Sequence, residues 1–207
     1  MSVSLSRGLE TAAERSPLVR EALALAHELH LGDWRETGSG KVPFIDHPLA
    51  VGELLAEESF AEEVLATGLL HDALEYSFIR LAELRERFGV DVAAVVYAMT
   101  ENTELEDYEM RKREVRGRVA AVGADAWMVF AADKLANVAV LREAYAIEGE
   151  NVDEDLPVNL DRKIPVWEED LEMLFKETDE DTPLVDRFAD EMVALWGQRA
   201  AELRANR

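Results

Sequence analysis

The sequence predicts an all-α protein, and three observations support this fold class. Apolar residues recur every three or four positions over most of the chain, which is the spacing of one face of a helix. Helix start and stop signals bound these segments: Ser16-Pro17 is typical of an N-cap followed by proline, and Gly89 and Gly123 each follow an apolar segment. No segment of useful length alternates apolar and polar residues, as a half-buried strand would.

These signals predict the helices in chain order. The first covers 18–31, the second begins at His47-Pro48, and the third follows Ser59 as its N-cap, with two glutamates in its first turn. The segment 90–99 is rich in β-branched residues, which suits a buried strand, but its flanking pattern favours a helix. The later helices are predicted at 79–88, 90–99, 108–122, 125–145, 162–176 and 184–203.

Length and composition indicate a single cytoplasmic domain. The chain has 207 residues, of which 48% are apolar, enough for one helical core. It contains no cysteine, which excludes disulfides, thiolate zinc sites and cysteine nucleophiles. No run of 18 apolar residues is present, and the first residues lack the apolar stretch of a signal peptide. We therefore expect a cytoplasmic protein without a membrane span.

The charge of the chain is strongly acidic and unevenly distributed. The formal net charge is -22, which disfavours nucleic acid and anionic membranes as partners. The segment 148–191 has 17 acidic residues against 4 basic ones. We therefore expect a core over 1–147 and an acidic helical extension over 148–207, packed on the same domain. The extension is either a solvated shell, the favoured interpretation, or a surface for a partner or lid; a homo-oligomer stays open.

The segment 37–42, TGSGKV, resembles a phosphate-binding loop only in part. The full pattern needs glycine where Arg35 stands and a hydroxyl side chain where Val42 stands, so the residue that would hold magnesium is missing. We predict a flexible loop. Lys41 is retained as a candidate charge for binding substrate.

Polar and charged residues inside apolar helices predict a metal centre. His71-Asp72 lies within GLLHDALE, and Asp133 lies within VFAADKLANV. A buried carboxylate needs a cation, either a metal ion or a salt-bridge partner. With a second imidazole from His47, two histidines and two carboxylates suit one divalent ion, which can activate water and polarise a phosphoryl group.

Helical spacing adds two candidate catalytic residues. Glu75 follows His71 by four positions and is expected on the same helix face, where it can hold or deprotonate the attacking water. Asn137 follows Asp133 by the same interval and can donate a hydrogen bond to Glu75 or to substrate.

Six stretches in order, AHELHLGDWR, PFIDHPLAV, ATGLLHDALE, RFGVDVAAVVYAMTE, EMRKREV and ADKLAN, extend the pattern over about 18–141. On these stretches the chain resembles the HD superfamily of phosphohydrolases, and within it the hydrolase domain of RelA/SpoT proteins and the small alarmone hydrolases. The resemblance implies an HD-domain helical bundle with one Mn²⁺ ion. It implies release of pyrophosphate from guanosine 3′,5′-bis(diphosphate) (ppGpp), a small-molecule nucleotide.

The resemblance also implies a role for each matching residue. It makes His47, His71, Asp72 and Asp133 the metal ligands, and Glu75 and Asn137 the catalytic residues. Candidate substrate-binding residues are Arg35, Lys41, Tyr76, Arg111, Lys112 and Lys134.

Three departures fall on substrate-facing positions. Tyr76 stands where the family has an acidic residue, Glu36 where it often has lysine, and Ala139 where it commonly has arginine. They leave open an HD-type phosphatase for a nucleoside monophosphate or for the 2′-phosphate of NADPH. A non-catalytic nucleotide-binding module is the third alternative.

Overall fold

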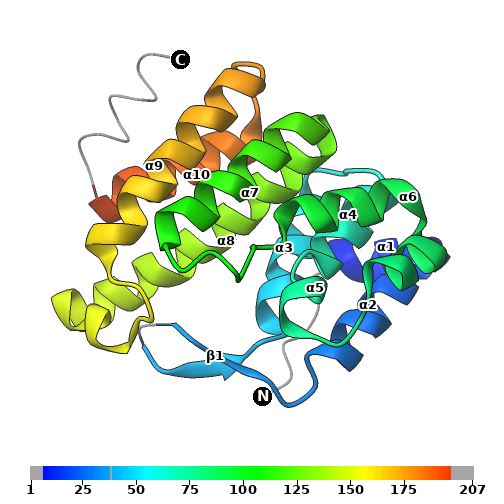
Figure 1. Ribbon diagram of the computed structural model, residues 1–207, viewed down its shortest axis with the longest axis horizontal. Coiled ribbons are helices and arrows are strands. Elements are labelled where there is room, and N and C mark those ends of the chain that lie inside the picture. The colour runs from blue at the N-terminus through cyan, green and yellow to red at the C-terminus, as the bar shows by residue number, and fades with distance from the viewer. Residues whose placement is uncertain (1–6, 38, 197–207) are drawn as a thin grey trace.

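The computed structural model describes residues 7–37 and 39–196 and is dominated by helices, as predicted (Figure 1). The first part of the chain contains α1 (Arg7–Arg15), α2 (Pro17–Leu29), β1 (Trp34–Glu36), β2 (Lys41–Pro43), α3 (Asp46–Glu57), α4 (Glu62–Leu70) and α5 (Ala73–Tyr76). The second part contains α6 (Leu81–Met99), α7 (Tyr108–Val122), α8 (Ala124–Glu148), a 3₁₀ helix (Gly149–Asp155), α9 (Leu160–Glu177) and α10 (Pro183–Trp196).

Most of the predicted helix boundaries are confirmed. Ser16 caps α2, because its Oγ accepts a hydrogen bond from the Val19 N–H at 3.2 Å. Gly89 and Gly123 adopt φ of 90° and 114°, a conformation that glycine reaches without a steric cost. They separate two helical stretches within α6, and α7 from α8, so 90–99 is helical as predicted.

Two expectations are corrected, and one helix was missed. Ser59 is not an N-cap, because it turns the chain at φ 60° and α4 begins three residues later, after Ala61. Of the segment 37–42, predicted as a flexible loop, Lys41 and Val42 belong to β2 and pair antiparallel with Glu36 and Arg35 of β1. The helix α1 was not predicted. The end of the last predicted helix, 197–203, lies outside the described residues.

The long helix α8 lies at the centre of the fold and packs against α3, α4, α6, α7, α9 and α10. Its residues Phe130, Ala131 and Ala132 are buried in the core. Asp133 and Lys134 follow directly and are buried as well, so the fold places a charged pair inside an apolar helix.

Two glycines let α3 and α4 pack closely. Leu55 of α3 fills the space where a Cβ on Gly68 would lie, and Leu69 of α4 fills the same space at Gly52. The helices run antiparallel, so the start of α3 meets the end of α4. His47 and His71 stand at those two helix ends.

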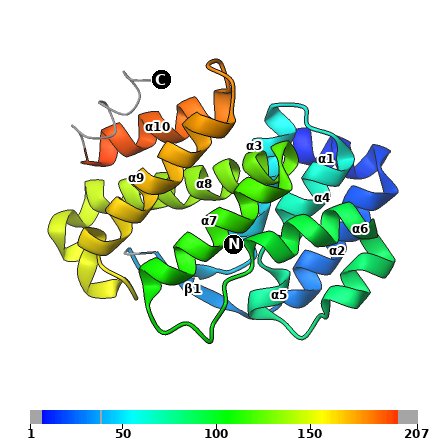
Figure 2. The ribbon, with the colours of Figure 1, turned by 45° about the horizontal axis from the view of Figure 1, so that its top comes forward.

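The described part of the acidic extension covers α7 and α8. Figures 1 and 2 both show α9 and α10 along this side of the molecule, and α10 packs against α8. Arg116 of α7 pairs with buried Asp170 of α9 at 2.8 Å, and Arg142 of α8 pairs with Glu191 of α10. These contacts support the expectation of an extension packed on the core. Within the described residues, no helix has the length and apolar character of a membrane span.

Candidate metal centre and cavity

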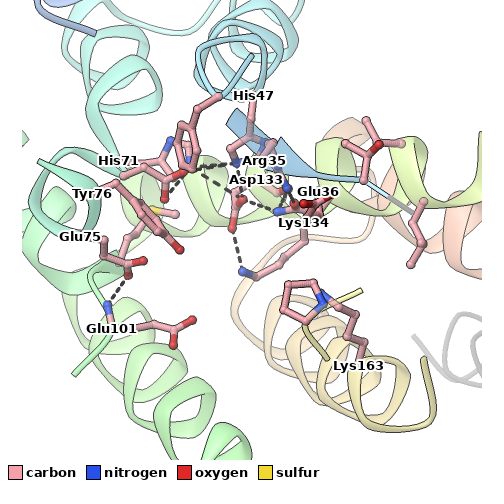
Figure 3. A pocket seen from close by; sticks show the side chains of 18 of the residues that line it. Arg35, Glu36, His47, His71, Glu75, Tyr76, Glu101, Asp133, Lys134 and Lys163 are labelled. Carbon is pink, nitrogen blue, oxygen red and sulfur yellow. Dashed lines mark hydrogen bonds and ion pairs between the residues drawn. The ribbon is translucent and has the colours of Figure 1, made fainter. Parts of the chain in front are cut away.

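Four side chains from three parts of the chain meet at one buried point (Figure 3). The Nε2 atoms of His47 and His71 lie 3.1 Å apart, and Asp133 Oδ1 lies 3.1 Å from the first and 3.7 Å from the second. Asp72 joins them, with Oδ1 3.4 Å from His71 Nε2 and Oδ2 3.8 Å from His47 Nε2. His47, His71 and Asp133 thus offer ligand atoms within 4.8 Å of one another, and Asp72 lies beside the two imidazoles.

The donor set fits one divalent cation. Ligand atoms at about 2.1 Å from one ion lie about 3.0 to 3.4 Å from one another, close to the separations in this cluster. The Nδ1–H of His71 donates to the Gly68 carbonyl oxygen at 2.7 Å, so its Nε2 lone pair points into the cluster. Burial lowers the pKa of His47, against the hydrogen bond that Asp133 accepts from its ring, and so favours the neutral imidazole that a ligand must be.

Asp133 is held ionised by its neighbours. Burial opposes its charge, but Lys134 Nζ lies 2.7 Å from Oδ2 and, together with His47, keeps the pKa of Asp133 well below its usual range. Asn137 Nδ2 donates to Asp133 Oδ1 at 2.6 Å, and its Oδ1 accepts from Arg35 at 2.8 Å. Asn137 therefore orients Asp133 and Arg35, where spacing had suggested a hydrogen bond to Glu75 or to substrate.

Glu75 is the candidate proton acceptor beside the cluster. The helix breaks at His71-Asp72, so Glu75 belongs to the short α5 and not to a continuous helix with His71. Its carboxylate accepts a short hydrogen bond from the Glu101 N–H. Burial, and then the charge of Asp72, raises the pKa of Glu75 to about 7, which suits a group that exchanges protons near neutral pH.

The raised pKa of Glu75 allows a test of this site that does not depend on an enzymatic assay. Between pH about 4.5 and about 7 the folded chain binds a proton at Glu75 that the unfolded chain releases, so stability falls as pH rises through this window. In chelator-treated protein, we expect Glu75→Gln to raise the free energy of unfolding, relative to wild type, by up to about 2 kcal/mol at pH 8 and little at pH 4. Urea unfolding at both pH values measures this difference.

Glu86→Gln on α6 is the matched control, because Glu86 is exposed and its loss also removes one negative charge from the chain. The control is expected to shift stability equally at both pH values. A pH-independent effect of Glu75→Gln would contradict a raised pKa of Glu75 in the folded chain.

The cluster forms one wall of a cavity of about 670 Å³. Four cations line it, although the chain as a whole is at -22. These cations are Arg35, Lys112, Lys134 and Lys163. The same lining also holds six carboxylates, so the cavity offers an anionic substrate individual cationic side chains and not an overall positive charge.

Some of the predicted substrate-binding residues line the cavity, and others lie outside it. Tyr76 lines the cavity, with its ring 4.8 Å from that of Phe44. Lys41 is exposed on β2, does not line the cavity, and pairs with Glu36 at 3.0 Å. Arg111 also lies outside the lining and is bound to Glu101 at 2.7 Å and to the loop carbonyls that precede α7.

Two features of the cavity were missed by sequence reasoning. Glu101 connects Glu75 to α7. Its N–H donates to the Glu75 carboxylate, and its own carboxylate pairs with Arg111 and Lys112. Lys163 and Trp167 of α9 also line the cavity. They lie in a segment whose strong acidity indicated only a surface, and no motif signals them.

A helical fold with two imidazoles and two carboxylates on a buried cavity wall defines a class of metal-binding helical proteins. Comparison with known families gives the particular one: a family model described as HD domain matches residues 22–152. The chain belongs to the HD domain family.

Known relatives agree with this assignment. A GTP pyrophosphokinase of Streptomyces coelicolor is 34% identical over 141 residues, covering 66% of this chain and 16% of that protein. A guanosine-3′,5′-bis(diphosphate) 3′-pyrophosphohydrolase of Aquifex aeolicus is 32% identical over 145 residues, covering 67% of this chain and 20% of that protein. The similarity thus spans about a fifth or less of these relatives.

Solved structures share the fold. The crystal structure of lmo0812 from Listeria monocytogenes has a TM-score of 0.67 at 29% identity, covering 73% of this chain and 99% of that one. A metazoan ortholog of SpoT has a TM-score of 0.59 at 22% identity, covering 92% and 96%.

Proposed function

We propose that this chain is a metal-dependent phosphohydrolase that releases pyrophosphate from the 3′ position of ppGpp. The observation that carries the proposal is the cluster of His47, His71, Asp72 and Asp133 on the wall of a cation-lined cavity, with Glu75 beside it. The relative from Aquifex aeolicus, whose name states this activity, supports the choice of substrate.

When bound, a divalent ion supplies charge that activates water and polarises a phosphoryl oxygen. Manganese suits the mixed set of imidazole and carboxylate ligands. Glu75 takes the proton of the attacking water, because its carboxylate faces the cavity and its pKa of about 7 matches neutral pH. Asn137 fixes Asp133, while Lys112 and Lys134 offset negative charge on the phosphates.

The function is tested by a substrate screen with manganese-loaded protein. We expect GDP and pyrophosphate in equal amounts from ppGpp, measured by anion-exchange chromatography. Absence of pyrophosphate would contradict the proposed substrate.

The same assay tests the role of Glu75. Glu75→Gln keeps all four metal-binding side chains and is expected to lower kcat by about a hundredfold or more, because the water loses its proton acceptor. The metal content of the variant, measured by elemental analysis, is expected to equal that of wild type. Full activity in the variant would assign the proton to another group.

A second candidate substrate is a phosphate monoester, either a nucleoside monophosphate or the 2′-phosphate of NADPH. It is favoured by Tyr76, which brings an aromatic ring to the cavity where the resembled hydrolases have an acid. Orthophosphate as the sole product in the screen, released from either monoester, would select this alternative.

A further inference from the structure

Lys163 stands out among the cations of the cavity because its charge is uncompensated. Lys112 is paired with Glu101, Lys134 with Asp133, and Arg35 donates to Asn137. Among the described residues, no carboxylate lies within ion-pair distance of Lys163, and its Nζ has no hydrogen-bond partner.

The surroundings of Lys163 disfavour its positive charge. Its side chain is partly buried against Trp167, with Nζ 5.6 Å from the ring. Burial first, and then the nearby charges of Lys112, Arg35 and Lys134, lower its pKa to about 8, while the charge of Glu101 opposes them. Three of the four charged groups that act most strongly on Lys163 are therefore cations, in a protein with a net charge of -22. An anion bound there would relieve that repulsion.

Position separates this region from the metal centre. Figure 3 shows Lys163 across the cavity from His47 and His71, on the wall formed by α9. Leu156, Pro157 and Trp167 line the same wall. Apolar neighbours limit water around an ion pair and so strengthen its electrostatic attraction.

We propose that Lys163 forms a second phosphate subsite, which binds the phosphate group of the nucleotide that is not cleaved. The proposal rests on the proposed function and narrows the substrate class to nucleotides with two separate phosphate groups. One group reacts at the metal centre, and the other neutralises Lys163. A nucleoside monophosphate that reacts at the metal centre would leave Lys163 unpaired. The acidic extension would then be part of the active site.

The subsite is tested by calorimetric binding of GDP and of guanosine to the full chain loaded with manganese. Lys163→Met keeps the length of the side chain and removes its charge. We expect it to weaken GDP binding by about tenfold or more, while guanosine binding is unchanged. Lys163→Arg is expected to stay within about threefold of wild type, because it restores the charge.

Lys176→Met is the matched control, since Lys176 is an exposed lysine of the same helix that does not line the cavity. It is expected to leave GDP binding unchanged. Equal GDP affinity in Lys163→Met and wild type would overturn the subsite. An equal loss of guanosine affinity in Lys163→Met would also overturn it, because the lysine would then act through packing and not through its charge. Wild-type protein that binds GDP no more tightly than guanosine would overturn it as well. Failure of the proposed function is seen separately, as intact ppGpp in the hydrolysis assay.

Discussion

Replacing Asp72 with alanine is expected to lower pyrophosphate release by about a thousandfold or more, because loss of a metal ligand removes several kcal/mol of transition-state stabilisation. Asp72 is the best ligand to remove. Its side chain is 18% exposed, against 2% for His71, so its truncation disturbs the core least. The measurement is kcat/KM for ppGpp with saturating manganese, together with the circular dichroism spectrum of the folded variant.

Asp33→Ala is the matched control for this variant. Asp33 is an aspartate that lines the same cavity but lies outside the cluster of four. Its loss is expected to change kcat/KM by no more than about threefold, as for other screened, exposed charges. If Asp72→Ala hydrolysed the substrate at the wild-type rate, the cluster would not be the catalytic centre.

Replacing Arg116 with alanine is expected to lower the free energy of unfolding by about 3 kcal/mol, which is the usual cost of leaving a buried charge without its partner. Arg116 Nε lies 2.8 Å from Asp170 Oδ1, and Asp170 is 1% exposed. Its Oδ2 has no hydrogen-bond partner among the described residues. Asp170 therefore depends on Arg116, which ties α7 to α9 and so holds the wall that presents Lys163.

Urea unfolding at pH 7 measures this effect. Arg113→Ala, an exposed arginine one turn earlier on α7, is the control and is expected to change stability by less than about 0.5 kcal/mol. The double variant Arg116→Met/Asp170→Leu is expected to recover most of the loss, because the carboxylate that Arg116 had paired is then no longer present. An equal loss in both arginine variants would contradict a buried ion pair between α7 and α9.

The helical fold could be predicted from local sequence because its boundaries depend on local chemistry. The Ser16 hydroxyl and the positive φ of Gly89 and Gly123 act within one turn. The prediction of Ser59 as an N-cap was wrong because serine is common in turns as well as at N-caps. Its own φ is positive, so it cannot take the extended backbone of an N-cap, and Ala61 takes that position.

The hairpin could not be predicted from alternation because each strand has only three residues. Its register depends on the turn, where Thr37 donates twice to the Gly40 carbonyl oxygen, from N–H and from Oγ1, each at 3.0 Å. The hairpin also holds Arg35 at the cavity, where it donates a hydrogen bond to Asn137. A segment that lacked a recognised motif therefore positions an arginine that lines the cavity.

A charged cluster around Asp133 was predictable because burial of a carboxylate in an apolar helix requires a cation. The sequence left open a salt bridge or a metal ion; Lys134 forms the salt bridge, and the metal ion stays a proposal. Lys163 was not predictable, because its uncompensated charge depends on residues brought together from α7, α8 and the hairpin. Its own sequence neighbours are largely acidic. The acidic neighbours thus gave no sign of Lys163, which among the described residues of this segment is the one cation that lines the cavity.

The central claim is that His47, His71, Asp72 and Asp133 hold one divalent ion. The most direct test is the manganese content of purified protein after equilibration with the metal and removal of the excess. Wild type and His27→Ala, which removes an exposed histidine of α2, are expected to hold one ion per chain. His71→Ala is expected to hold about a tenth of that or less. One ion per chain in His71→Ala, or none in wild type, would contradict a metal ion held by these four residues.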